Sequence, residues 1–418
     1  MRTRRSTLTP LLSVLPLLVA CGDTSGPDDG AADTMAELPR ALTAVESELV
    51  SASNAFGFDL LREVLAREER PNVVLSPLSA SIALGMTLNG ADGDTYDAMQ
   101  ETLGYGGMEQ GEINTAYQDL TRLLVELDPA VDFRVANSLW ADEGFPFETS
   151  FVETVSEAFD ASARTLDLQA PATLDEINGW VEEETNGYIP RLLDEIGSDL
   201  VMFLINAIYF ESTWSTRFDE ADTQPAPFRT AGGEAVQVQL MNMRDPDVAF
   251  GVGEGFTAVD LPYGGQAYGM LVLLPTEGAS ARELASGLTA ADLASLEASM
   301  GERELSRLAL PRFRLAYGTE LNAALEAMGM GVAFDESAAD FSRMSPEARL
   351  FIDQVRQKAF IEVDEAGTRA AAATSVGVGV TSLPPEFVVD RPFVFLLRER
   401  LSGTVLFAGV VGDPTAEE

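Results

Sequence analysis

The sequence predicts an α+β protein in which helices and strands are mixed along the chain. Three observations predict this class. Apolar residues recur at helical spacing over residues 56–65, as in a helix with one buried face. Residues 201–210 form a continuous apolar run, which is typical of a strand buried on both faces. Residues 236–240 alternate apolar and polar side chains, which indicates a half-buried strand.

The elements follow in a readable order from the N-terminal side. A first helix ends near Arg70, and a brief strand over residues 73–75 follows it. Ser76 can cap the next helix, and Pro77 at its first position loses no hydrogen bond. The later elements expected are a helix ending near 103, a helix over 174–193, strands over 201–210 and 236–240, a hairpin region over 261–275, a strand over 310–315 and a helix over 320–328.

The charge balance of the 418-residue chain is strongly acidic. There are 67 Asp and Glu residues against 27 Lys and Arg residues, so the formal net charge is −40. Nucleic-acid binding needs a basic face that neutralises phosphates, so we expect no nucleic-acid partner. An acidic surface mainly favours solubility. Because carboxylates meet by chance on so acidic a chain, their pairs identify no acid–base dyad.

The chain contains no histidine. This excludes Ser-His-Asp and Cys-His nucleophilic catalysis, histidine general bases and most zinc sites. The glycine-rich segments 104–111 and 251–255 do not have the spacing of a phosphate-binding loop. We therefore expect no enzyme of the ordinary hydrolase type, no metal site and no cofactor.

The N-terminus has the features of a secretory signal. Three arginines at positions 2, 4 and 5 precede a short apolar stretch over residues 8–20. That stretch is too short to span a bilayer comfortably as a helix. We therefore expect residues 1–20 to be a signal peptide and the rest of the chain to be secreted across the inner membrane of a bacterium.

The single cysteine, Cys21, follows Leu18-Val19-Ala20. This arrangement resembles a bacterial lipobox, in which cleavage leaves the cysteine first and lipid is attached to it. The alternative is an ordinary signal peptide with an incidental cysteine. Several acyl chains would anchor the protein stably in a lipid membrane, at the bacterial envelope or cell surface. Residues 21–40 would then be the lipidated N-terminus and a flexible tether. A single cysteine excludes an intrachain disulfide.

Residues 365–385 are compatible with a strand and also with an exposed loop. Alternate positions that would share one face are Thr368, Ala370, Ala372, Thr374, Val376, Val378 and Val380. The positions between them are Arg369, Ala371, Ala373, Ser375, Gly377 and Gly379. This alternation predicts a half-buried strand, but small side chains and glycines weaken a strand. An alanine-rich helix over residues 366–373 is the alternative, which the glycines and the alternation disfavour.

Several segments resemble the serpins, the serine-protease-inhibitor family. The early segments are residues 72–88 with 90–95 after them, 137–140, 177–187 and 206–210 with Trp214 and 217–219 after them. The late segments are residues 362–374, 383–387, 390–393 and 403–409. The resemblance covers roughly residues 42–415, and no interior linker or repeat interrupts it. We therefore expect one domain over residues 41–418.

The resemblance implies the serpin fold, with a mixed large central β-sheet, two smaller sheets, about eight or nine helices and an exposed reactive loop at about residues 365–385. It also implies an activity. A serine protease attacks the loop as a substrate, and after the acyl-enzyme forms, the first half of the loop inserts into the main sheet as a new strand. The protein would be a monomer that forms a covalent complex with a secreted serine protease.

The hinge of the loop is carried over residue by residue. The matching positions are Glu365, Gly367, Thr368, Arg369, Ala370, Ala371, Ala372, Ala373 and Thr374. Arg369 departs from the family's usual acidic residue, but the alternation places it on the outward face. The inward positions carry no charge, which favours an inhibitor. The alternatives are a non-inhibitory serpin that acts as a binding or carrier protein, and an inhibitor of cysteine proteases.

The family spacing also locates the reactive bond. Counted from Gly367, the cleaved bond is Thr381-Ser382, and cleavage after Val380 or Leu383 is the alternative. The residues before the bond are small and uncharged, so nothing there suits a trypsin-like pocket. The resemblance therefore implies a target with a small apolar specificity pocket, elastase-like or subtilisin-like.

Two polar groups of the family have matching residues. The shutter positions, beneath the opening sheet, are Ser76, Ser79, Asn206 and Gln357. Gln357 replaces the family's usual histidine, and an amide can still donate and accept hydrogen bonds without responding to pH. The breach positions, at one end of the sheet, are Trp214, Arg312 and Glu365. The resemblance implies an ion pair between Arg312 and Glu365.

Overall fold

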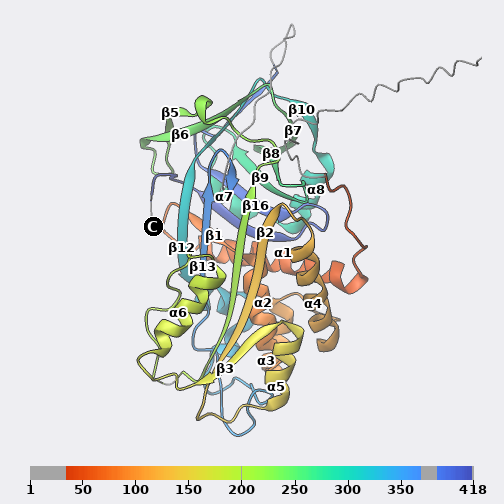
Figure 1. Ribbon diagram of the computed structural model, residues 1–418, viewed down its shortest axis with the longest axis vertical. Coiled ribbons are helices and arrows are strands. Elements are labelled where there is room, and N and C mark those ends of the chain that lie inside the picture. The colour runs from red at the N-terminus through yellow and green to blue at the C-terminus, as the bar shows by residue number, and fades with distance from the viewer. Residues whose placement is uncertain (1–33, 199, 369–383, 417–418) are drawn as a thin grey trace, which may run out of the picture. The chain divides into compact units, whose positions relative to one another are not determined.

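Helices and strands are mixed throughout the folded chain, which confirms the α+β class (Figure 1). The computed structural model describes residues 34–198, 200–368 and 384–416. Their strands form four hydrogen-bonded sheets, where one large and two smaller sheets were expected. The additional sheet arises because β4 (Met202–Thr213) and β13 (Arg356–Val363) are not bonded to each other.

The largest sheet has seven antiparallel strands and forms one wall of the core. In spatial order they are β1 (Val73–Leu75), β17 (Val405–Val411), β16 (Phe393–Glu399), β9 (Tyr268–Pro275), β8 (Phe256–Tyr263), β7 (Asp247–Gly253) and β10 (Gly301–Glu304). Every residue of β9, β16 and β17 is buried, as expected for strands covered on both faces. The hairpin region expected over residues 261–275 is the β8–β9 pair.

The other three sheets are smaller. One contains β14 (Gly367–Thr368), β4, β2 (Val131–Asp142) and β3 (Ala161–Leu166), in that order. A second contains β12 (Phe313–Glu320) and β13. The third contains β15 (Glu386–Val388), β11 (Arg307–Pro311), β6 (Ala235–Arg244) and β5 (Gln224–Arg229). The first two of these sheets lie on either side of the candidate site.

Most helices lie between or beside these sheets. Those of the first half are α1 (Ala44–Leu65), α2 (Pro77–Leu88), α3 (Gly93–Thr102), α4 (Gln110–Glu126), α5 (Thr149–Ala158) and α6 (Thr173–Glu184). Those of the second half are η1 (Glu220–Asp222), α7 (Ala281–Gly287), α8 (Ala290–Ser299), α9 (Asn322–Leu325), η2 (Glu326–Met330) and α10 (Gly331–Phe334). The expected start of α2 is confirmed, because the Ser76 hydroxyl accepts from the backbone N–H of Ser79 at 3.3 Å.

The helix expected over residues 174–193 is shorter than predicted. It ends at Glu184, because Asn186 and Gly187 both have positive φ angles, 51° and 83°, which a helix cannot contain. Residues 185–198, the crossing segment, then run without regular structure from α6 toward β4. The helix expected over residues 320–328 begins two residues later than predicted, because Glu320 ends β12; the kink at Gly329, whose φ is 117°, lies just beyond the expected range.

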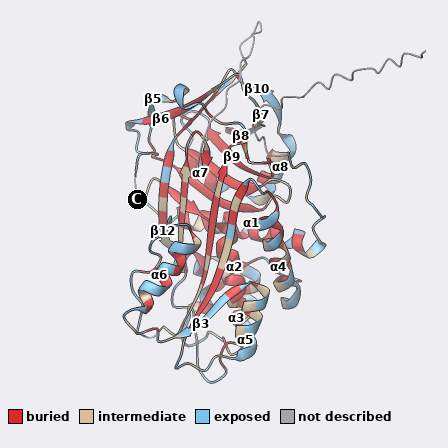
Figure 2. Ribbon diagram, viewed as in Figure 1, coloured by how far each residue is buried: buried red, intermediate tan, exposed pale blue. Residues whose placement is uncertain are grey.

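Buried residues are spread over the strands and over many of the helices (Figure 2), and their apolar side chains form two clusters. The larger fills the space between the seven-stranded sheet, α1, α2 and the inner face of β4, where Ile208 and Phe210 lie. The smaller lies on the outer face of β4 and β2, under α6, and contains Trp140, Trp180 and Ala207. Alternate residues of β4 therefore face two different cores. No helix in the described ranges has the length and apolarity needed to cross a membrane.

Candidate functional site

An open slot lies between β4 and β13. One edge of β4 bonds to β2, while the other edge bonds, within the described residues, only to β14 at Ser212 and Thr213. In the same part of the chain, β13 bonds only to β12. A pocket of about 590 Å³ opens between the two edges. Backbone donors and acceptors along such edges are ready to pair, so the slot has the form that accepts one further strand.

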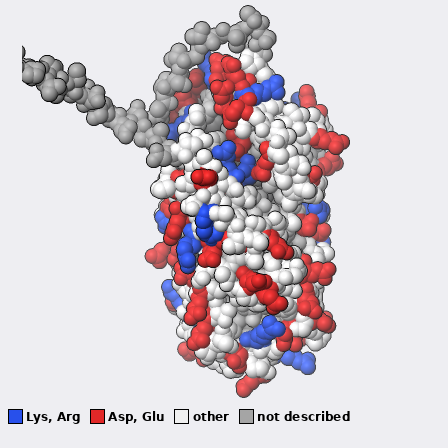
Figure 3. Space-filling view, turned by 90° about the vertical axis from the view of Figure 1, so that its right-hand side faces the viewer, with Lys and Arg blue, Asp and Glu red and all other residues white. Residues whose placement is uncertain are grey.

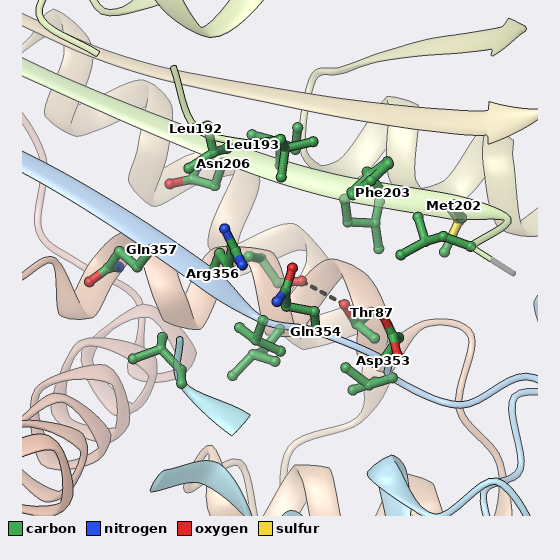
Figure 4. A pocket seen from close by; sticks show the side chains of 18 of the residues that line it. Thr87, Leu192, Leu193, Met202, Phe203, Asn206, Asp353, Gln354, Arg356 and Gln357 are labelled. Atoms are coloured by element: carbon green, nitrogen blue, oxygen red, sulfur yellow. Dashed lines mark hydrogen bonds between the residues drawn. The ribbon is translucent and has the colours of Figure 1, made fainter. Parts of the chain in front are cut away.

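Side chains from both strands line this pocket (Figure 4). Phe203 and Asn206 project from β4, and Arg356 and Gln357 belong to the start of β13. Leu192 of the crossing segment lies on the side of β4. The pocket is thus apolar at one end and carries amide side chains at the level of Asn206.

The chain reaches one end of the slot directly from β13. A tight turn, closed by a bridge between Asp364 and Gly367, leads into β14. There Gly367 pairs with Thr213, and the backbone of Thr368 pairs with Ser212. The φ of Gly367 is 130°, and a Cβ at this position would lie 2.4 Å from the Trp214 nitrogen, so only glycine fits. The described part of the loop therefore begins in register with β4.

The three breach residues meet at this turn. Trp214 is buried, donates from Nε1 to the Asp364 carbonyl at 2.9 Å and stacks on Tyr263 at 4.2 Å. Arg312 donates from Nε to Glu365 Oε1 at 2.7 Å. Burial favours the neutral form of Glu365, but hydrogen bonds from Arg312 and from the Thr223 hydroxyl outweigh it and lower its pKa. The carboxylate thus stays charged in a buried position.

The four shutter residues form two separate groups. Gln357 accepts from the Ser76 N–H at 2.9 Å and donates to the Ser76 carbonyl at 2.8 Å. The Ser76 hydroxyl donates to the Leu406 carbonyl and accepts from the Ser79 N–H. Gln357 therefore connects β13 to the start of α2. Ser76 in turn connects α2 to β17 of the seven-stranded sheet.

Asn206 belongs to the other group. Its Nδ2 donates to Asn137 Oδ1 of β2 at 2.7 Å, and Asn137 donates to the Phe159 carbonyl at 2.6 Å. Asn206 Oδ1 is buried without a hydrogen-bond partner among the described residues. Such an acceptor costs free energy until a donor reaches it.

Part of the expected site lies outside the described residues. This holds for hinge residues 369–374, for Val380, Thr381, Ser382 and Leu383 around the reactive bond, and for Cys21. Three described residues were not expected to contribute: Asn137, Thr223 and Tyr188. Asn137 opens a segment that resembles serpins, which was an available signal. Thr223 and Tyr188 contact residues that are distant in the sequence. No local sequence pattern predicts such contacts.

Charge on the surface agrees with the composition. Acidic side chains are spread over the face drawn in Figure 3, with basic side chains between them. The whole chain carries a net charge of −40. A polyanion such as a nucleic acid would be repelled by this balance.

The family model described as serpin (serine protease inhibitor) matches residues 51–414. Glia-derived nexin of Rattus norvegicus is 32% identical over 390 residues, which cover 89% of this chain and 96% of that protein. The relative is therefore matched over nearly its whole length.

Solved structures show the same fold. Tengpin, a thermophilic serpin solved in its native state, aligns with a TM-score of 0.80 and 29% identity, covering 91% of this chain and 97% of tengpin. Human thyroxine-binding globulin, complexed with thyroxine, aligns with a TM-score of 0.81 and 27% identity, covering 89% of this chain and all of that one. A thermophilic serpin and a thyroxine-binding globulin thus share this architecture.

Proposed function

The chain belongs to the serpin family, whose members are mostly protease inhibitors, and from this premise we propose that it is a suicide-type inhibitor of serine endopeptidases. The single observation that carries the proposal is the open slot between β4 and β13, with the loop already paired to β4 at its end. A cleaved loop could therefore insert as a strand between the unpaired edges of β4 and β13.

The register of β14 extends through the slot. Thr368 pairs with Ser212, so continued antiparallel pairing sets residues 369–378 against residues 211–202 of β4. The bridge between Asp364 and Gly367 sets the same residues against 362–353 on the side of β13. An inserted loop would then bond to both edges, residue for residue.

This register assigns the loop residues to two faces. Ala370 would lie between Phe210 and Ile361, both buried in the larger core. Arg369 would lie between Glu211 and Glu362 on the outer face. The small side chains therefore face the core, and the one cation of the hinge meets two carboxylates. This supports an inserting loop rather than a permanently exposed one.

The polar residue Thr374 also finds a partner in this register. It would lie between Asn206 and Gln357 on the inner face. Asn206 Oδ1 is the buried acceptor without a donor. A threonine hydroxyl can donate to it, so insertion would complete the polar group that the open slot leaves incomplete.

The free energy available is large enough for trapping. Residues 369–378 would form ladder hydrogen bonds along two edges, each contributing about 0.5–1.5 kcal/mol net. Together with burial of the inner side chains, insertion would release on the order of 10 kcal/mol. The protease serine would attack the carbonyl carbon of Thr381, the amine of Ser382 would leave, and insertion would separate the acylated protease from that amine.

The loop sequence supports a target class. We propose cleavage at Thr381-Ser382, with Val380 and Leu383 as competing positions, by an elastase-like or subtilisin-like protease with a small apolar pocket. A cysteine protease that reads the same residues remains the alternative target. The covalent complex would contain one inhibitor monomer and one protease.

We also propose that the protein acts outside the cytoplasm, bound to the bacterial envelope or cell surface. The arginine-rich start, the apolar residues 8–20 and Cys21 after Leu18-Val19-Ala20 support a lipoprotein signal. Mass spectrometry of the mature N-terminus tests it. Diacylglycerol on Cys21 is expected, and a Cys21→Ser variant should leave the membrane fraction. An unmodified cysteine would contradict the anchor.

Purified protein incubated separately with elastase and with subtilisin tests the inhibitor proposal. A covalent complex that survives SDS is expected, and mass spectrometry of it identifies the acylated residue. Clean cleavage of the loop with fully active protease would contradict trapping.

A carrier function is the second candidate, because thyroxine-binding globulin shares the fold. A carrier whose loop never inserts should gain no thermal stability after cleavage, whereas an inhibitor should gain a large amount. Hydrolysis of peptide and ester substrates would be the sign of an enzyme, which the missing histidines disfavour.

A further inference from the structure

The ring of Tyr188, in the crossing segment, lies against both edges of the slot. It stacks on Tyr209 of β4 with the ring centroids 5.7 Å apart and the planes at 26°. It stacks on Phe360 of β13 at 4.6 Å and 29°. These two strands share no hydrogen bond in the described chain. One half-buried side chain therefore connects two edges that the backbone leaves apart.

Tyr209 and Phe360 stand at the same level of the slot. Gly367 pairs with Thr213 of β4 on one side and with Asp364 on the other. Tyr209 precedes Thr213 by four residues, and Phe360 precedes Asp364 by four residues, so the two aromatic residues are at the same height along the slot. A strand in the slot would therefore place one residue directly between them. Directly opposite residues in paired strands point to the same face. The side chain of that residue would occupy the space against which the Tyr188 ring now packs.

We propose that Tyr188 is a positioning residue that closes the outer face of the slot and slows strand insertion. A strand can enter at this level only after the ring has left one or both of its aromatic partners. The inference rests on the proposed function for its role in trapping, but the slot and the ring contacts are independent of any protease.

Other contacts of the crossing segment are weaker restraints. Asn186 donates to the Tyr209 hydroxyl at 3.2 Å, and Lys358 donates to the Arg191 carbonyl at 2.9 Å. Arg356 pairs with Asp194 at 3.3 Å, but the Asp194 side chain is 74% exposed. Exposed ion pairs contribute little. The aromatic stacks are the contacts that touch both edges through one side chain.

The expected consequence is a balance between two properties. After acylation, hydrolysis of the ester competes with insertion, so slower insertion releases more active protease for each inhibitor consumed. Before cleavage, the same delay protects the native form from spontaneous insertion. Removing the ring should therefore improve trapping and shorten the lifetime of the native form together.

Insertion of a synthetic peptide measures this step without a protease. The probe is the acetylated peptide of residues 368–380, added to the purified protein, and the measurement is the rate at which a more heat-stable species appears. Tyr188→Ala should accelerate insertion roughly tenfold, the effect of losing two aromatic contacts of ordinary strength. Tyr188→Phe keeps the stacks and should remain close to the natural rate.

The matched control is Tyr96→Ala. Tyr96 is also half-buried, lies under the Arg343 guanidinium at 5.1 Å and does not line the pocket of the slot. It should lose stability without faster insertion. A peptide with arginine in place of Ala370 should not insert into any variant.

The outcomes separate the two proposals. Equal insertion rates for Tyr188→Ala and the natural protein, or no insertion into Tyr188→Ala, would overturn the role of Tyr188 whatever the proteases show. Equal acceleration in Tyr96→Ala would show general destabilisation and would overturn it as well. Faster peptide insertion with no protease trapped by any variant would leave the role of Tyr188 intact and contradict the inhibitor proposal.

Discussion

Arg312 donates a hydrogen bond from Nε to Glu365 Oε1 at 2.7 Å and forms an ion pair with the same oxygen through Nη2 at 2.5 Å, and the Glu365 side chain is only 5% exposed. Arg312 lies between β11 and β12, and Glu365 lies in the turn from β13 to β14. The pair therefore fixes the point at which the loop leaves the sheet. A buried carboxylate depends strongly on such a partner, which makes this contact a restraint on early insertion.

Glu365→Gln should lower the free energy of unfolding by about 1–3 kcal/mol, because hydrogen bonds to a charged group are lost. It should also accelerate spontaneous conversion to an inserted, more heat-stable form. The control is Glu46→Gln, which removes an equally buried carboxylate paired with Arg40 at 2.8 Å, far from the slot. Conversion that is equally fast in both variants would contradict a specific role for the Arg312–Glu365 pair.

The same pair predicts a pH dependence. The pKa of Glu365 is lowered below its ordinary value of 4.5, since hydrogen bonds outweigh burial. Its stabilising contribution is therefore complete above about pH 4.5 and is lost as the pH falls through the lowered pKa. The stability difference between the natural protein and Glu365→Gln, measured by denaturant unfolding, should shrink on acidification below that pH. A difference that grows on acidification would contradict the assignment.

Ala370→Arg should leave a protein that proteases cleave as a substrate without being trapped by the proposed mechanism. If the register of β14 continues through the slot, residue 370 of the inserted strand would face the larger core between Phe210 and Ile361, and a buried unpaired charge is costly. The SDS-resistant complex should disappear while the loop is still cleaved, as gel electrophoresis would show. Arg369→Ala is the control, since residue 369 faces outward and its variant should still trap. A persistent complex with Ala370→Arg would mean that the register is wrong.

Arg369→Glu should weaken insertion although residue 369 of an inserted strand would lie on the outer face. The register places Arg369 between Glu211 and Glu362. Cross-strand pairs of opposite charge contribute about 0.2–1 kcal/mol each, and like charges oppose pairing by similar amounts. The gain in thermal stability after loop cleavage should therefore be smaller for Arg369→Glu than for Arg369→Ala. The defect should diminish at high salt, and an unchanged gain would argue against this placement.

Thr374→Val tests the polar level of the slot. Valine has nearly the same shape but cannot donate to Asn206 Oδ1, which is buried without a partner in the described structure. The stability gained on loop cleavage should fall by about 1 kcal/mol, whereas Thr374→Ser should retain most of it. Thermal unfolding of the cleaved forms measures the difference. Equal gains for Val and Ser would show that the hydroxyl does not reach Asn206.

Sequence periodicity determined much of the fold. The helical spacing over residues 56–65 and the alternation over residues 236–240 correspond to α1 and β6, because burial on one face imposes a period on the chain. In any strand formed by residues 368–380, Arg369 would point to the opposite face from Ala370 and Ala372, because successive side chains alternate between faces. The segments that resemble serpins indicate the family from sequence alone, and the family model confirms it over residues 51–414.

Only the tertiary structure decided which edges and side chains meet. Periodicity predicts which face of a strand is buried, but it does not predict which strand edges remain unpaired. The slot between β4 and β13 therefore could not be predicted from the sequence. Shutter residue Asn206 bonds Asn137 across the β2–β4 ladder and not Gln357. Tyr188 reaches both edges because α6 ends early at the positive φ angles of residues 186 and 187. Hydrogen bonds and ring contacts of this kind depend on the distance between elements remote in sequence, which local pattern cannot encode.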